Sequence, residues 1–241
     1  MEQHTAGLGL PGEISVSLLS VYDWEAPDGL HGGSPHFHTA SREGYVVVGG
    51  EGEVHTLSAD GFQVTPLRTG TLVWFTPGTV HRLVNGEHLS IVTLMQNSGL
   101  PESGDAVMTF PLEYLTDAET YRAAHALPED PGEREAAARA RRDLALRGYA
   151  ELKAEVERAG PAALREYHER AAVIVADRIG QWQSLWRAGP LAQAEQTGAQ
   201  LEALASGDAT HLAQATVRVS ERHDGEAWGM CGRLVTWPRP E

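Results

Sequence analysis

The sequence is poor in cysteine. Cys231 is the only cysteine among 241 residues, so no disulfide can form within the chain. The same count excludes a zinc site built from several thiolates. We therefore expect a reducing, cytoplasmic location, and we expect any metal to be bound by nitrogen and oxygen ligands.

Basic residues and long apolar runs are also scarce. The chain has 19 Lys and Arg against 33 Asp and Glu, which gives a formal net charge of -14. Such a chain repels phosphate backbones and anionic lipid surfaces. It contains no run of about 18 apolar residues, and residues 1–13 lack the basic start and apolar stretch of an export signal. We expect no nucleic-acid partner and no membrane association.

What the sequence does contain, between residues 14 and 97, is a series of short apolar or alternating runs. This pattern is typical of an antiparallel β-barrel or sandwich. The runs with strand character are 14–24, 45–50, 52–58, 62–68, 71–77, 81–85 and 89–96. Turns are expected at 58–61, 68–71 and 85–88, and Asn85-Gly86 gives the strongest hairpin signal. Connections this short leave no room for crossover helices, so the sheet is predicted to be antiparallel.

From about residue 115 the sequence changes to Ala, Glu, Arg and Leu at helical spacing. Pro131 and Gly160 bound a first helix. A second is expected from Pro161 to Gly189-Pro190 and a third over 191–205, and together they are predicted to form a helical hairpin or small bundle.

Strand character returns in residues 215–222 and 229–240, which are expected to form a hairpin that pairs with the barrel or with a partner subunit. The predicted fold class is therefore mainly β with an α appendage. Its parts are a barrel over residues 1–112, a helical segment over 113–212 and a terminal β-hairpin over 213–241.

The stretch PHFHTASREGYVVVGG, residues 35–50, contains the residues that point to chemistry. Alternate residues of a strand share a face, so His36 and His38 present two imidazoles side by side. Glu43 reaches the same point if its strand is adjacent. His81 follows the turn pair Pro77-Gly78. Three imidazoles and one carboxylate suit one divalent transition metal such as Fe, Mn, Ni, Cu, Zn or Co, with one or two positions left for water or substrate.

These residues resemble the two conserved motifs of the cupin superfamily. The first motif is matched by Gly29, His36, His38, Glu43 and Gly50, and the second by Gly70, Pro77, Gly78, His81 and Asn85. The leading glycine is one position early, and Pro77 and Gly78 are adjacent where the family separates them by one residue. Both differences lie in turns.

The resemblance spans residues 29–85 and does not reach the helical part. It implies a small antiparallel barrel or jelly roll, a metal near its centre held by His36, His38, Glu43 and His81, and frequent dimerisation. Family members without metal hydrogen-bond their polar residues to one another instead. An unpaired carboxylate inside the barrel would cost several kcal/mol, which favours the ion.

Five further residues are candidates for substrate binding. Tyr45, Trp74 and Phe75 are aromatic residues that line a substrate cavity or belong to the core. Arg42 is a clamp for an anionic substrate at the barrel mouth or a solvated loop residue. His31 is a mouth residue or acid/base group, or a loop histidine without a role.

Three functions are compatible with this site. The first is a metal-dependent enzyme acting on a small oxygen-bearing molecule, most simply a dioxygenase-type oxidoreductase as in the quercetinase-like cupins, in which Glu43 also accepts a substrate proton. A non-redox metal would instead support an isomerase, epimerase or decarboxylase. The third is a sensor that binds a small ligand without catalysis. The helical segment is expected to cover the barrel mouth or to form the interface of a homodimer.

Overall fold

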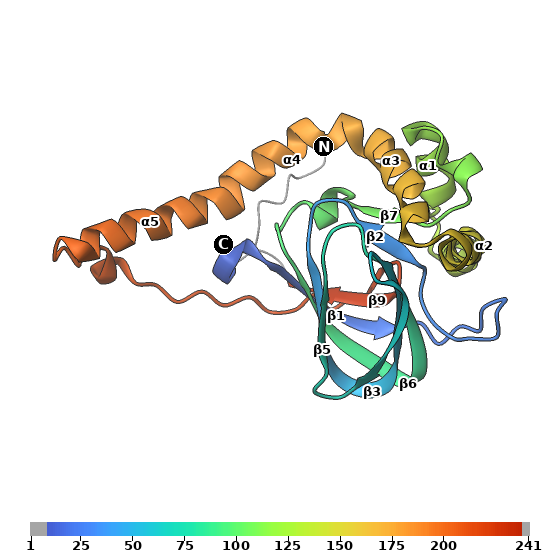
Figure 1. Ribbon diagram of the computed structural model, residues 1–241. Coiled ribbons are helices and arrows are strands. Elements are labelled where there is room, and N and C mark those ends of the chain that lie inside the picture. The colour runs from blue at the N-terminus through green and yellow to red at the C-terminus, as the bar shows by residue number, and fades with distance from the viewer. Residues whose placement is uncertain (1–8, 238–241) are drawn as a thin grey trace.

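The computed structural model describes residues 9–237, which form a β-barrel, helices packed against it and a helical arm that extends away from it (Figure 1). The strands are β1 (Ser15–Val21), β2 (His36–His38), β3 (Glu43–Ser58), β4 (Gly61–Arg68), β5 (Leu72–Phe75), β6 (Val80–Met95), β7 (Ala106–Met108), β8 (Ala227–Trp228) and β9 (Gly232–Thr236). The α-helices are α1 (Ala118–His125), α2 (Pro131–Ala159), α3 (Leu164–Val175), α4 (Ile179–Trp186) and α5 (Ala192–Ala205).

All the strand pairs of the barrel are antiparallel. The main path of the sheet runs β4-β3-β6-β1-β9-β8, β5 pairs with β3, and β2 pairs with both β6 and β7. The two longest strands, β3 and β6, pair along most of their length and form the centre of the sheet. The antiparallel barrel with helices after it, expected from the alternating runs, is confirmed.

Two of the three expected turns are present, but the hairpin predicted at Asn85-Gly86 is wrong. Strand β6 continues through these residues, and β3 likewise continues through Gly50, so two pairs of predicted strands are each a single strand. Both strands bend together where their register shifts, between Val47 and Gly52. Gly50 has a φ of 67° there, and a Cβ atom would lie 2.1 Å from the carbonyl oxygen of Glu87.

The side chain of Asn85 explains why an Asn-Gly pair does not turn the chain here. Its Nδ2 donates a hydrogen bond of 3.0 Å to the carbonyl of Val21, and its Oδ1 accepts one of 3.0 Å from the backbone N–H of Leu89. The amide thus links β6 to the end of β1 and satisfies a backbone donor at the bend. It stabilises a bend within a long strand.

The long helix α2 has the ends that the sequence indicates. The Asp130 side chain caps its first turn, Pro131 is its first residue, and Gly160, with a φ of 83°, ends it. The break predicted at Gly189-Pro190 is wrong, because residues Arg187–Leu191 form a π-helical turn that joins α4 to α5. Proline has no backbone N–H to donate, and the wider π-helical turn accommodates Pro190 without ending the helix.

As a result, α4 and α5 form an arm that points away from the barrel, and the third helix is not part of a bundle (Figure 1). Leu201 on α5 is 63% exposed. Within residues 9–237 no helix is both long enough and apolar enough to cross a membrane.

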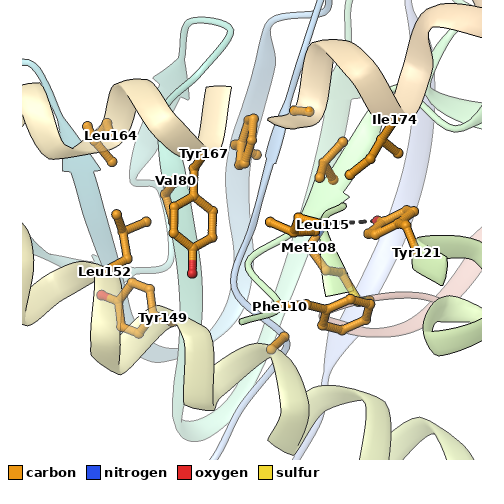
Figure 2. Close-up of a cluster of buried hydrophobic side chains, with 14 of the residues drawn as sticks. Val80, Met108, Phe110, Leu115, Tyr121, Tyr149, Leu152, Leu164, Tyr167 and Ile174 are labelled. Atoms are coloured by element: carbon orange, nitrogen blue, oxygen red, sulfur yellow. Dashed lines mark hydrogen bonds between the residues drawn. The ribbon is translucent and has the colours of Figure 1, made fainter. Parts of the chain in front are cut away.

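Helices α1, α2 and α3, called the helical layer below, pack against the outside of the barrel. Figure 2 shows Tyr149 and Leu152 of α2 and Tyr167 of α3 around a common apolar cluster with Val80 of β6. The hydroxyl of Tyr121 in α1 accepts a hydrogen bond of 3.0 Å from the backbone of β7. One apolar stripe of α3 is buried in this cluster; it consists of Leu164, Tyr167, Ala171 and Ile174.

The end of the described chain returns to the barrel, as predicted. Strand β9 pairs with β1 over five residue pairs, from Ser17 opposite Thr236 to Val21 opposite Gly232. The strand predicted at 215–222 is wrong, since no strand forms there and Val217 is 90% exposed. The chain rejoins the sheet after this segment, where the N–H of His223 donates a hydrogen bond of 2.9 Å to the carbonyl of Thr236 in β9, and β8 then pairs with β9. Residues 238–241 of the predicted hairpin lie outside the described residues.

Candidate metal centre

The four predicted ligands come together inside the barrel. One donor atom from each of His36, His38, Glu43 and His81 lies within 4.8 Å of the others, and all four residues are buried. The strand of Glu43 is not adjacent to that of His36 and His38, contrary to what the sequence suggests. Strand β2 pairs with β6 and not with β3, so His81 is the cross-strand neighbour of His36. Glu43, at the first position of β3, reaches the cluster from a strand that is not paired with β2.

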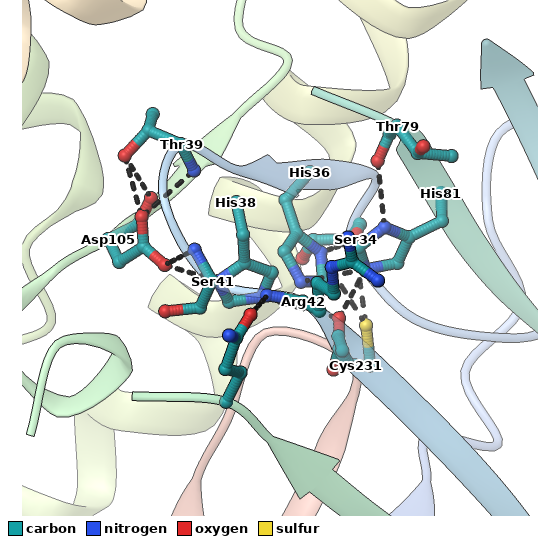
Figure 3. A network of polar contacts seen from close by, with 12 residues as sticks. Ser34, His36, His38, Thr39, Ser41, Arg42, Thr79, His81, Asp105 and Cys231 are labelled. Carbon is teal, nitrogen blue, oxygen red and sulfur yellow. Dashed lines mark hydrogen bonds and ion pairs between the residues drawn. The ribbon is translucent and has the colours of Figure 1, made fainter. Parts of the chain in front are cut away.

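The backbone fixes the orientation of two imidazoles. Nδ1 of His36 lies 3.0 Å from the carbonyl oxygen of Ser34, and Nδ1 of His81 lies 3.0 Å from that of Thr79 (Figure 3). Because a carbonyl only accepts, each Nδ1 carries a hydrogen, and each Nε2 is the ring nitrogen that can coordinate a metal. Burial lowers the pKa of His36 to about 3, so this ring stays neutral.

Electron-rich atoms therefore converge on one point. The Nε2 atoms of His36 and His81 are 3.2 Å apart, and Oε2 of Glu43 is 2.9 Å from Nε2 of His81. This oxygen is buried and has no hydrogen bond of good geometry. A cation between the three groups would satisfy all of them at once. The arrangement fits a divalent metal.

The third imidazole is oriented by a carboxylate that the sequence analysis did not identify. Nε2 of His38 is 3.3 Å from Oε2 of Glu43, and its Nδ1 is 3.4 Å from Oδ2 of Asp105. Burial lowers the pKa of His38, but the charge of Glu43 and the contacts with both carboxylates outweigh burial and raise it to about 9. A carboxylate behind a histidine ligand is a common arrangement in metal sites, where it fixes the ring and increases its basicity.

Asp105 is itself held firmly. It is fully buried and accepts hydrogen bonds from the backbone N–H groups of Thr39, Ala40 and Ser41, at 2.9, 2.7 and 2.9 Å (Figure 3). These bonds and His38 hold its pKa far below the usual range, although burial alone would raise it. Asp105 directly precedes β7, and only the pairing of β7 with β2 brings it to His38. No local pattern in the sequence marks it.

Glu43 is a carboxylate in this environment. Burial would raise its pKa, but His81 and His38 outweigh burial and lower the pKa well below its usual value. The ring of Phe75 stacks on His81, with centroids 4.8 Å apart and planes 7° apart, and packs edge-on against Tyr45. Burial and the charge of Glu43 raise the pKa of Tyr45 well above its usual value, so its hydroxyl stays protonated.

A cavity of about 490 Å³ adjoins the cluster, and His36, His38, Glu43 and Tyr45 form part of its wall. Much of the remaining wall comes from outside the sequence motifs. It includes Ser15, Ser17 and Leu19 of β1, Met95 of β6, the segment 228–231 and Leu234 of β9. The C-terminal residues were not predicted to belong to the site, because only the pairing of β9 with β1 places them there.

The predicted substrate-binding residues divide into two groups. Tyr45 is buried and lines the cavity, and Phe75 lies behind it against His81. Trp74 is 66% exposed, because it alternates with Phe75 along β5 and faces outward. The prediction that Trp74 lines a cavity is wrong.

Arg42 and His31 also lie outside the cavity wall. The exposed Arg42 contacts Gln96 through its backbone N–H. Nδ1 of His31 is 2.8 Å from a carboxylate oxygen of Asp23 in a loop outside the cavity. Of the two alternatives given for each residue, the structure fits a solvated loop arginine for Arg42 and a loop histidine for His31. Position in the sequence next to a ligand or motif did not place either side chain in the cavity.

Comparison with protein families identifies the barrel. Residues 23–95 match the family model described as the cupin domain, and this range contains all four candidate ligands. This part of the chain is a cupin domain. In the cupin domain, Gly78 supports the site: its N–H donates a hydrogen bond of 2.8 Å to the carbonyl of His38. Its φ of 85° favours glycine, and its carbonyl oxygen is 2.9 Å from Nε2 of His168 in α3.

Solved structures resemble the cupin domain only distantly. One is an uncharacterised conserved protein with a double-stranded β-helix domain from Klebsiella pneumoniae, at 20% identity over 39% of this chain and 70% of that chain, with a TM-score of 0.29. A predicted oxalate decarboxylase from Thermotoga maritima is 18% identical over 34% of this chain and 64% of that chain, with a TM-score of 0.26. A TDP-quinovose 3,4-ketoisomerase from Campylobacter jejuni is 9% identical over 33% and 60%, with a TM-score of 0.28.

The match spans less than two thirds of the decarboxylase and ketoisomerase chains. At these identities and TM-scores the similarities carry no argument about function. A search of curated proteins gives no match to this sequence.

Proposed function

We propose that the cupin domain binds one divalent transition metal through His36, His38, Glu43 and His81, and that the protein is an enzyme acting on a small oxygen-bearing organic molecule. The reaction class proposed is that of a dioxygenase-type oxidoreductase. The observation that carries the proposal is the convergence of four buried donor residues beside a cavity of about 490 Å³, whose wall includes three of them, His36, His38 and Glu43. Cavities of this size accept small organic ligands.

A bound redox metal would supply Lewis acidity and electron transfer with O2. The protein contributes positioning. Carbonyl groups orient His36 and His81, Asp105 orients His38, and apolar residues such as Leu19 and Met95 limit the water beside the ligands. A rigid ligand set of this kind holds a substrate oxygen in a defined place.

The role of Glu43 as a proton acceptor is part of the proposal. Its low pKa makes it a metal ligand first and a weak base second, since an efficient base has a pKa near the working pH. Glu43→Gln keeps the shape of the side chain and removes the charge. We expect this variant to retain part of the metal and to lose turnover.

Metal content tests the first part of the proposal. Wild-type protein, purified without chelators, is expected to contain one equivalent of a transition metal, and His81→Ala is expected to contain far less. His31→Ala is the matched control, because His31 lies outside the cavity and pairs with Asp23. A wild-type protein that takes up no metal would refute the proposal.

Oxygen consumption tests the reaction class. Flavonols and enediol compounds are offered to the metal-loaded protein in an oxygen electrode, with His81→Ala as the inactive control. Consumption that depends on both the metal and the compound supports the dioxygenase. Conversion without loss of O2 would instead identify an isomerase, epimerase or decarboxylase. Stoichiometric binding without conversion would identify a sensor.

A further inference from the structure

A buried cation lines the same cavity from the helical layer. Arg141 of α2 is 7% exposed and forms part of the cavity wall together with His36. Its Nη1 donates to the carbonyl of His125 at 3.2 Å and its Nη2 to that of Gly229 at 3.3 Å. Its Nε is buried and has no partner. A guanidinium has five N–H donors, so Arg141 retains unused donors next to an open space.

The neighbouring residue shows how this fold satisfies a buried arginine. Arg142 is 2% exposed, and its Nη2 lies 2.8 Å from a carboxylate oxygen of Asp143. It also donates to the carbonyls of Trp24 and Glu25, at 2.7 and 2.8 Å. Arg141 forms no ion pair with a carboxylate of residues 9–237 and donates only to carbonyls. A buried charge without a counter-ion is costly, so this side chain is adapted to an anion from outside the chain.

The segment Gly229–Cys231 connects Arg141 to the metal centre. Gly229 accepts hydrogen bonds from Arg141 and, at 3.0 Å, from the hydroxyl of Tyr22. Two residues later, Sγ of Cys231 lies 3.8 Å from Nδ1 of His36. Trp228 and Met230 contribute apolar surface to the same wall. One cavity therefore contains a cluster for a metal, apolar walls and a cation.

We infer that Arg141 binds a carboxylate group of the substrate, so that the substrates are small organic acids whose other oxygen atoms face the metal. This inference rests on the proposed function and adds the substrate class. The net charge of -14 repels anions at long range, so recognition depends on a short-range contact with this buried guanidinium. The inference gives Arg141 the clamp role that was one of two alternatives predicted for Arg42.

The test uses two compounds of similar shape, 3,4-dihydroxybenzoate and 3,4-dihydroxybenzamide, in which a charged carboxylate is replaced by a neutral amide. Both offer the same hydroxyl groups to the metal. Isothermal titration calorimetry on the metal-loaded wild type is expected to show a preference for the benzoate of about tenfold to a hundredfold, the usual effect of a charged hydrogen bond. Arg141→Gln is expected to abolish the preference by weakening benzoate binding, and Arg141→Lys to retain part of it.

Arg139→Gln is the matched control, because Arg139 is on the same helix but is exposed and pairs with Glu135. It is expected to keep the full preference. Equal affinity of the wild type for both compounds, no binding of either, or a preference that survives Arg141→Gln would overturn the inference. If Arg141→Gln does not fold, the wild type and Arg141→Lys decide: a preference as large in the lysine variant as in the wild type contradicts recognition by the guanidinium.

Failure of the proposed function gives a different result, the absence of metal from the wild type. Arg141 is not one of the four candidate metal ligands, so Arg141→Gln is expected to contain as much metal as the wild type. The preference for the benzoate can also be measured on metal-free protein, where the difference between the wild type and Arg141→Gln isolates the contribution of Arg141. The two proposals can therefore fail separately.

Discussion

Strand β2 separates two regions with opposite properties. On its inner side, His36 and His38 face the cavity, where Nδ1 of His38 and Oε2 of Glu43 are buried without a hydrogen bond of good geometry. On its outer side, Phe37 packs into the helical layer, with its ring 5.3 Å from that of His168. The inner region has polar atoms that need a ligand, whereas the outer region buries apolar surface. Side chains of three consecutive residues therefore serve different purposes: those on the inner face of β2 are available for binding, and the one on its outer face stabilises the fold.

One contact between the two regions lies beside the candidate metal ligands. His168 of the helical layer contacts the carbonyl of Gly78, and the N–H of Gly78 bonds to the carbonyl of His38. The helical layer therefore supports the turn that precedes His81. Variants in each region test whether metal binding and stability remain independent despite this contact.

The largest effect is expected for His36→Ala in the inner region. Removal of one of four ligands is expected to weaken metal binding on the order of a thousandfold or more, because each of the four ligands contributes strongly to the affinity. Competition with a chromogenic chelator measures the affinity. Metal binding that persists in the variant would show that the cluster is not the metal centre.

The second effect is expected for Phe37→Ala in the outer region. Loss of this buried ring is expected to lower the free energy of unfolding by about 3–5 kcal/mol, as for other buried phenylalanines. Urea unfolding of the metal-free protein measures it. The folded variant is expected to keep its metal stoichiometry, and loss of metal from folded protein would show that the regions are not separable.

The third prediction concerns pH. Metal binding requires the neutral ring of His38, which in the metal-free protein is protonated below a pKa of about 9. Metal affinity is therefore expected to rise about tenfold per pH unit from neutral pH to about 9. The free energy of unfolding of the metal-free protein changes in the opposite sense. Because folding raises the pKa of His38, its protonation stabilises the folded protein most at pH values below the usual histidine pKa, and this stabilisation is lost as the pH rises towards 9. Titrations in buffers that do not bind metals test both slopes.

A smaller effect is expected for Asp105→Asn. The amide keeps an oxygen that accepts from the backbone, but it removes the charge behind His38. Metal affinity is expected to fall about tenfold to a hundredfold, and the pH dependence is expected to shift to lower pH because the pKa of His38 falls. An unchanged pH profile would show that Asp105 serves only the backbone.

The smallest effect is expected in the arm, outside both regions. Leu201 is exposed on α5, so Leu201→Ser is expected to change the free energy of unfolding by less than about 0.5 kcal/mol. Thermal unfolding at two protein concentrations measures it. A loss of stability that depends on concentration would show that another molecule covers the arm in solution.

The sequence predicts best what depends on neighbouring residues. The alternation of His36 and His38, the strand at Glu43 and the turn before His81 are local patterns, and the four residues come together as expected. Asp105 and Arg141 were missed because pairing and packing between distant segments bring them to the site. Two local patterns gave wrong predictions because their surroundings differ from the usual ones. Gly189-Pro190 does not end the helix, since it lies in a π-helical turn, and Asn85-Gly86 does not form a hairpin, since the amide of Asn85 stabilises a bend within β6.

The return of β9 to β1 also determines when the site can be completed during synthesis. His38 leaves the ribosome about 190 residues before Cys231, which corresponds to about 10–40 s at ordinary rates of translation. Until then the edge of β1 is unpaired and the wall formed by Gly229–Cys231 is absent. All four candidate ligands thus leave the ribosome well before the last strand, so the proposed metal has access to them before this strand completes the cavity wall.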